Sequence, residues 1–286
     1  VMSVDTYYYK LAYEMGIQRL HDWMVRFGFG KETGIDLPNE KSGIMPSPKW
    51  KKDTYDKGWL PGETISVSIG QGYFLATPLQ IANATAMTAS KGFHITPHLL
   101  KSSDGAAAVD VITKPDGKID YNGKPSDWLR MHDAMEQTVK AGTGRGIYTP
   151  RYRIAGKTGT AQVKSIAQGK SYNKSAIDKR HWDHAWFNGF APVEDPQIAL
   201  AVLVENGGGG SVVAAPIGRA LFDYWVLQRD TNPILPPTTE QLKVIKRQKA
   251  FEKAMRDAIR EKEDKALEAA KEKQKEPTQT AAATVE

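Results

Sequence analysis

The 286-residue sequence contains no cysteine and no long apolar run. Without cysteine, disulfide bonds and thiolate zinc sites are excluded, and the redox state of the compartment cannot be inferred. No segment approaches the roughly 18 apolar residues that a membrane-spanning helix needs, and residues 1–5 (VMSVD) do not form a signal peptide. If the protein has a membrane anchor, we expect it outside this sequence.

The net charge is also small outside one segment. Residues 243–276 hold twelve lysines and arginines against eight aspartates and glutamates, and thus four of the six net positive charges. A nucleic-acid site would need basic residues and stacking aromatics on one folded face, so no binding of nucleic acid is expected. We expect a folded domain over residues 1–232, a charged and partly helical tail over 233–276, and disorder over 277–286.

Apolar residues recur at helical spacing in four segments, which predict helices over 6–15, 17–27, 77–90 and 126–142. The third of these begins with a capping box formed by Thr77 and Gln80. The fourth, capped by Ser126, is expected to bury Trp128, Met131, Met135 and Val139. Residues 31–62 carry four prolines and predict a long loop.

The second half of the sequence changes to extended segments. They predict strands over 154–163, 184–193 and 198–205, after short strands and turns between 95 and 122. A closing helix is expected over 215–227, with Ile217, Leu221 and Trp225 facing inward. Helices, then strands, then a helix on the sheet predict an α+β fold with an antiparallel sheet flanked by helices.

The strongest motif is GKTGTAQ at residues 156–162, on the first strand of that sheet. A phosphate-binding loop would need glycine in place of Arg151 and a helix after the threonine, and neither requirement is met. The other interpretation is the Lys-Thr-Gly strand of serine acyl-transfer enzymes. Lys157 would place a cation beside the nucleophile, Thr158 and Thr160 would bind a substrate carboxylate, and Gly159 would let an extended peptide approach. The backbone N–H of Thr160 would form half of an oxyanion hole.

Enzymes of this kind need a second motif, Ser-x-Asn, and the sequence opens with Ser3-Val4-Asp5. Taken alone, Asp5 could simply cap a helix. Together with the downstream motif in the right order, the segment favours a catalytic role for Ser3 and Asp5.

The sequence resembles class B penicillin-binding proteins, and among them the elongation-type transpeptidases. The resemblance covers about Ser3 to Leu227 and rests on SVDTYYYK at 3–10, FGFG at 27–30, TGIDL at 33–37, IGQG at 69–72, TPLQ at 77–80, the Lys157 strand and FAP at 190–192. It implies the serine β-lactamase and penicillin-binding transpeptidase fold, with the N-terminal part of the domain missing from this sequence. The family's Ser-x-x-Lys, whose serine is acylated, is therefore expected upstream of Val1.

Two details depart from the family pattern or imitate it. Asp5 stands where most relatives carry asparagine; an ionised aspartate cannot donate to a substrate carbonyl, so we expect it to pair with a nearby lysine. The segment SYNK at 171–174 imitates Ser-x-x-Lys, but it follows the Lys157 strand in a polar loop and is a poor nucleophile candidate.

The resemblance implies a peptidoglycan D,D-transpeptidase that crosslinks stem peptides through an acyl-enzyme during cell-wall elongation and is a target of β-lactams. It also implies a catalytic domain in the periplasm, anchored in the bacterial inner membrane, and an elongation glycosyltransferase of the SEDS (RodA-like) family as partner. No cofactor or metal is expected. The alternatives are a β-lactamase or penicillin sensor of the same fold, and a non-catalytic scaffold whose charged tail binds partners.

Three weaker patterns have simpler interpretations. His181 and His184 could bind a metal but lack a visible third ligand, so a loop entering a strand is favoured. The glycines of residues 142–146 indicate a turn. The aromatic residues Trp186, Phe187 and Phe190 are expected in the core on one face of their strand, although an exposed one could line a substrate groove.

Overall fold

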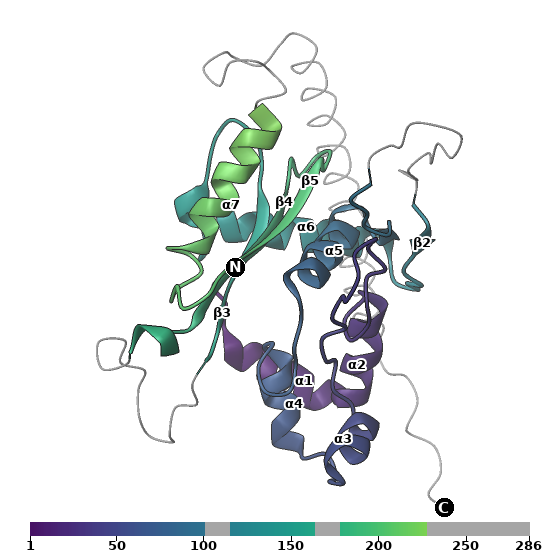
Figure 1. The fold of residues 1–286 in the computed structure, drawn as a ribbon. Helices are drawn as coiled ribbons and strands as arrows, with labels where there is room; N and C mark the ends of the chain where they lie inside the picture. The colour runs from purple at the N-terminus through teal and green to yellow at the C-terminus, as the bar shows by residue number, and fades with distance from the viewer. Residues whose placement is uncertain (101–114, 164–177, 228–286) are drawn as a thin grey trace, which may run out of the picture. The chain divides into compact units, whose positions relative to one another are not determined.

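The computed structural model describes residues 1–100, 115–163 and 178–227, all of which belong to one compact unit, Val1–Thr231 (Figure 1). The expected tail segments 233–276 and 277–286, and the Ser171 segment, lie outside the described residues. Helices surround a three-stranded antiparallel sheet, which confirms the predicted α+β class.

The main sheet consists of β3 (Ala155–Ala161), β4 (His184–Ala191) and β5 (Ile198–Val204) in the order β3-β4-β5. All three strands lie where the sequence predicted them, although each is shorter than expected. Lys157 pairs with Asn188 in the register of β3 and β4. Among the described residues β3 pairs only with β4, so its other edge is open there.

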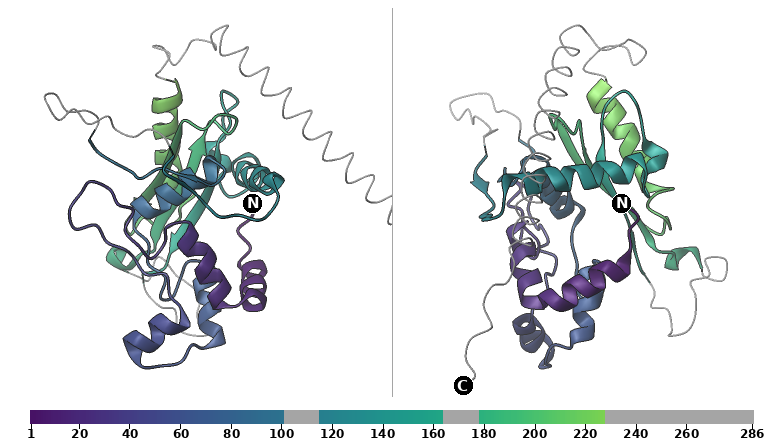
Figure 2. Two further views of the ribbon diagram at one scale, coloured as in Figure 1. Left: turned by 90° about the vertical axis from the view of Figure 1, so that its right-hand side faces the viewer. Right: turned by 180° about the vertical axis from the view of Figure 1, so that it is seen from behind.

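Helices cover both faces of this sheet (Figures 1 and 2). On one face Phe187 is fully buried and packs against Phe222 of α7 (Ala214–Phe222). On the other face Phe190 packs against His132 of α6 (Pro125–Lys140), and the Asn188 amide donates to the Thr85 hydroxyl of α5 (Pro78–Ala89) at 3.0 Å. Phe187 and Phe190 are thus core residues, as predicted, but on opposite faces of the sheet.

The predicted inward face of α7 is wrong. Ile217, Leu221 and Trp225 are 44%, 45% and 39% exposed, whereas the helix buries Ala214, Ala215, Gly218 and Phe222. Small side chains let the helix approach the sheet closely, and Gly218 leaves the room that the Phe187 ring fills. The helix also ends at Phe222, and a π-helical turn follows over Asp223–Leu227.

The first two helices are confirmed as α1 (Asp5–Met15) and α2 (Ile17–Arg26), separated by Gly16 at φ 77°. The predicted long loop 31–62 is wrong, because α3 (Pro48–Tyr55) lies within it and α4 (Pro61–Ser68) begins in it. Both helices start with proline. Proline suits this position because the N–H groups of the first helical turn make no hydrogen bond within the helix, so the N–H that proline lacks is not needed there. Two of the four prolines in this segment, Pro48 and Pro61, therefore mark helix starts. Ile17, Phe29, Met45 and Val67 form the core beneath these helices.

The capping box of α5 is confirmed. The Thr77 hydroxyl accepts from the Gln80 backbone at 3.1 Å, and the Gln80 side chain accepts from the Thr77 backbone at 2.9 Å. The predicted cap of α6, Ser126, is two residues late, since Lys124 occupies the cap position and Pro125 opens the helix. Met131 is 40% exposed and not part of the buried face. The two short strands β1 (Phe93–His94) and β2 (Gly117–Lys118) pair antiparallel.

Candidate active site

The Lys157 side chain lies at the open edge of β3 and reaches the N-terminal segment of the chain. Its amine donates to the Ser3 hydroxyl at 2.9 Å and to the Thr158 carbonyl at 2.6 Å. The structure thus brings together two groups that are 154 positions apart in the sequence. A hydroxyl held by a lysine amine at hydrogen-bond distance is an arrangement that can pass a proton.

Ser3 is exposed and has a φ of 56°, a left-handed value that residues other than glycine adopt rarely. The segment before it is tied to the turn after α6, because the Thr143 backbone donates to the Val1 carbonyl at 3.2 Å. That turn also approaches closely through Gly142, where a Cβ would lie 2.3 Å from the Val1 carbonyl oxygen. These contacts hold the segment in which the Ser3 hydroxyl lies next to Lys157 of β3.

Asp5 is the first residue of α1 and follows the cap residue, Val4. It is therefore not the helix cap that one interpretation of the sequence allowed, although a carboxylate in the first turn favours a helix. Burial lowers the pKa of the Lys157 amine, and the negative charge of Asp5 partly opposes this shift. Asp5 thus acts on Lys157 through its charge.

The three residues after Lys157 have different surroundings. Thr158 is 8% exposed, and its hydroxyl shares a 2.7 Å hydrogen bond with the Thr143 hydroxyl. Gly159 lies close to Gly210. A Cβ at position 210 would come within 2.3 Å of the Gly159 carbonyl oxygen, so only glycine fits there. Thr160 is exposed. Of the two threonines expected to bind a substrate carboxylate, Thr160 presents its side chain freely, and Thr158 is engaged by Thr143.

Sequence reasoning missed two residues that contact this strand. Thr143 was treated only as part of a turn, yet it contacts Thr158. Gln71 was noted only within the IGQG segment, yet its side-chain amide donates to the Thr160 carbonyl at 3.1 Å. The IGQG segment of the resemblance was the available signal for Gln71, and nothing in the sequence pointed to Thr143.

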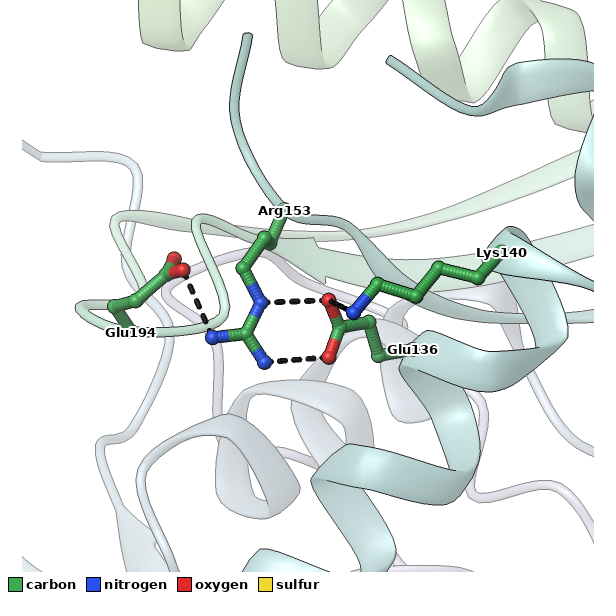
Figure 3. A network of polar contacts seen from close by, with 4 residues as sticks. All are labelled: Glu136, Lys140, Arg153 and Glu194. Atoms are coloured by element: carbon green, nitrogen blue, oxygen red, sulfur yellow. Dashed lines mark hydrogen bonds and ion pairs between the residues drawn. The ribbon is translucent and has the colours of Figure 1, made fainter. Parts of the chain in front are cut away.

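The start of β3 is fixed to α6 by a network of charged groups (Figure 3). Arg153 donates to both oxygens of Glu136, at 2.6 and 2.5 Å, and to Glu194 at 3.0 Å. Lys140 adds a further contact to Glu136 at 2.7 Å. The Glu136 side chain is only 1% exposed. Burial alone would raise the pKa of Glu136, but the hydrogen bonds from Arg153 and Lys140 outweigh burial and lower it.

Metal binding and membrane spanning were also considered for the described residues. Over residues 1–100, 115–163 and 178–227, no three His, Asp or Glu side chains gather in a group that could hold a metal ion. His184 accepts instead from the Asn206 backbone at 2.9 Å. In the same part of the chain, every helix is too short or too polar to span a bilayer.

Comparison with known proteins shows the family of this chain. The family model described as the penicillin binding protein transpeptidase domain matches residues 1–223, and the chain belongs to this family. Peptidoglycan D,D-transpeptidase MrdA of Acinetobacter baumannii is 56% identical over 237 residues, which are 82% of this chain and 35% of that protein. The chain thus spans about a third of the length of the curated relatives it matches.

Solved structures show the same fold. PBP2 of Pseudomonas aeruginosa in complex with WCK 5153 matches with a TM-score of 0.66 and 46% identity, over 78% of this chain and 45% of that chain. A peptidoglycan synthase complex, described as coordinating polymerization and crosslinking, contains a chain with a TM-score of 0.61 and 33% identity. That match covers 78% of this chain and 36% of the other. The penicillin-binding transpeptidase fold expected from the sequence is therefore confirmed.

Proposed function

We propose that the full-length protein is a peptidoglycan D,D-transpeptidase, and that the described residues form the non-nucleophilic side of its active site. The observation that carries this proposal is the 2.9 Å hydrogen bond from the Lys157 amine to the Ser3 hydroxyl at the open edge of β3. The membership of the transpeptidase family and the 56% identity to a D,D-transpeptidase support the same function.

The reaction would proceed through an acyl-enzyme. A serine of a Ser-x-x-Lys segment upstream of Val1 attacks the carbonyl carbon of the D-Ala-D-Ala bond. As the ester forms, the C–N bond breaks, and terminal D-Ala leaves with the proton that Ser3 relays to its amine. The amine of a neighbouring stem peptide then attacks the ester, forms the new amide and returns the proton to the serine.

The residues of β3 would serve both steps. Lys157 keeps a positive charge beside the Ser3 hydroxyl, which favours movement of the proton through it. The backbone N–H of Thr160 stabilises the negative oxygen of the tetrahedral intermediate, and an oxyanion-hole donor contributes about 3 kcal/mol. The Thr160 hydroxyl binds the carboxylate of the substrate. Asp5 acts through its charge on Lys157 rather than as a donor to the substrate.

The biological setting is part of the same proposal. We place the folded domain at residues 1–232 in the periplasm, held by an inner-membrane anchor outside this chain. Penicillins would acylate the same upstream serine. The matching chain of a synthase complex that coordinates polymerization and crosslinking supports a glycosyltransferase partner, for which we propose a SEDS (RodA-like) protein of cell elongation.

The test is acylation of the full-length protein by a fluorescent penicillin. Lys157→Ala should slow labelling by roughly 10²- to 10⁴-fold, the usual contribution of a positioned proton-transfer group. Lys49→Ala is the matched control, because the Lys49 side chain is 83% exposed on α3, and it should label at the parent rate. Equal labelling of both variants would refute the role of Lys157, and steady hydrolysis of penicillin by the parent would indicate a β-lactamase.

The pH profile gives a second readout. Burial lowers the pKa of Lys157, so the parent should lose labelling activity as pH rises through a value below the ordinary lysine pKa. Lys157→Arg keeps its charge at higher pH, so its residual activity should lack this alkaline decline.

A further inference from the structure

Gln71 occupies a turn whose shape depends on two glycines. Gly70 and Gly72 have φ values of 78° and 68°, a left-handed conformation that glycine adopts without penalty. The Gln71 backbone donates to the Ser66 carbonyl at 3.0 Å, which closes the turn against the end of α4. The turn therefore fixes the direction in which the Gln71 side chain leaves the backbone.

That direction is toward the open edge of β3. The Gln71 amide donates to the Thr160 carbonyl at 3.1 Å, and the Lys157 amine donates to the Thr158 carbonyl at 2.6 Å. Backbone groups two residues apart on a strand point to the same side. Since Gln71 lies outside the sheet, both carbonyls face the open edge, and both are already occupied by side-chain donors.

An extended peptide that adds to this edge needs the Thr160 carbonyl as an acceptor for one of its own N–H groups. It must therefore displace the Gln71 amide. The exchange replaces one neutral hydrogen bond with another, so Gln71 opposes binding only weakly. The strand itself does not depend on Gln71, because every residue of β3 is in register with β4.

We propose that Gln71 is a specificity-determining residue that holds the Thr160 carbonyl in the empty groove and yields it to a backbone N–H of the acyl peptide. This inference rests on the proposed function. Ligands that carry an amide N–H at this position compete with Gln71. Ligands without such a group leave the Gln71 hydrogen bond in place.

The experiment compares two acylating probes on the full-length protein. A penicillin carries an acylamino group, whose N–H can pair with the Thr160 carbonyl, and a carbapenem carries none. Gln71→Met keeps the length of the side chain but removes the donor. It should raise the second-order acylation rate constant for the penicillin about two- to tenfold and leave the carbapenem rate unchanged.

Two further variants make the comparison sharp. Gln71→Leu also removes the donor and adds no charge beside the carboxylate of the probe, so it should change the penicillin rate in the same direction. Gln18→Met is the matched control, because it removes the 2.8 Å hydrogen bond that the Gln18 side-chain amide donates to Asp22 at an exposed position on α2. It should change neither rate.

A selective rise for the penicillin in both Gln71 variants supports the inference. The inference would be overturned if the two acylation rate constants changed equally, if the penicillin rate constant fell, or if neither changed. Each of these results assumes that the parent protein reacts with the probes. A parent protein that reacts with neither probe would overturn the proposed function, and this inference with it.

Discussion

Removing Arg153 tests how strongly the start of β3 depends on one buried carboxylate. In Arg153→Met, Glu136 loses two hydrogen bonds, of 2.6 and 2.5 Å, while its side chain stays 1% exposed. Breaking a buried ion pair from one side costs about 3 to 5 kcal/mol, because a charge remains without its partner. Lys140 still contacts Glu136 at 2.7 Å, so we expect the lower end, a loss of about 3 kcal/mol in the free energy of unfolding.

The assay is urea unfolding, followed by circular dichroism, in which the midpoint should fall while the slope stays constant. Lys49→Met is the matched control, because it breaks a lysine-carboxylate pair whose side chains are 83% and 58% exposed. Such a surface pair contributes at most about 0.5 kcal/mol. Equal midpoints for Arg153→Met and Lys49→Met would refute the reasoning.

The contribution of Glu136 to stability should also depend on pH. The pKa of Glu136 is lowered in the folded protein, so its contribution to stability is present above the unfolded pKa and is lost as pH falls through the folded pKa. Without Arg153 the folded pKa rises, and Arg153→Met should begin to lose stability at a higher pH than the parent. A double variant that also carries Glu136→Leu should recover part of the loss, because no unpaired charge stays buried.

Two further substitutions test the packing of α7 and the contacts of Asp116 beside β2. Gly218→Ala should destabilise the protein by about 1 to 3 kcal/mol, because its Cβ would lie 2.4 Å from the buried Phe187 ring. Gly62→Ala in α4 is the control; its Cβ would have nothing within 4 Å, so it should be neutral or slightly stabilising. Thermal unfolding of the two variants measures the difference. Asp116 has its pKa lowered to about 2 by hydrogen bonds from the Thr96 side chain and backbone and by His94, so its stabilising effect is present above about pH 4 and lost as pH falls toward 2. Asp116→Asn should remove that component, about 1 kcal/mol after solvent screening, and identical pH dependence of unfolding in parent and variant would contradict this assignment.

Local patterns in the sequence were sufficient for most of the sheet and helices. Extended segments between turns predicted β4 and β5, and the capping box at Thr77 fixed the start of α5, because both signals act between residues close in the sequence. The Lys157 strand was found in the same way. Its motif is continuous, and small residues on both sides of the lysine continue the extended run.

The errors arose where distant contacts or ambiguous residues decide the outcome. Proline was taken as a sign of loop in residues 31–62, although Pro48 and Pro61 open helices. In α7 the bulky apolar residues face outward, because close packing on the sheet selects the small ones. The contacts of Gln71 and Thr143 with β3 span 89 and 15 positions, and no periodicity within the sequence encodes them.

The position of Lys157 depends on the opposite face of the sheet as well as on its own. The Phe187 ring fills a space bounded by Gly156, Gly189 and Gly218, and a Cβ at any of them would come within 3.2 Å of the ring. Gly156 directly precedes Lys157, so a side chain there would push β3 away from β4 and move the lysine relative to Ser3. In the proposed mechanism the Lys157 amine must stay within hydrogen-bond distance of Ser3, so a displacement of about 1 Å at β3 would be enough to weaken proton transfer. The glycines behind the strand therefore constrain the active site even though none of them can contact a substrate from that face.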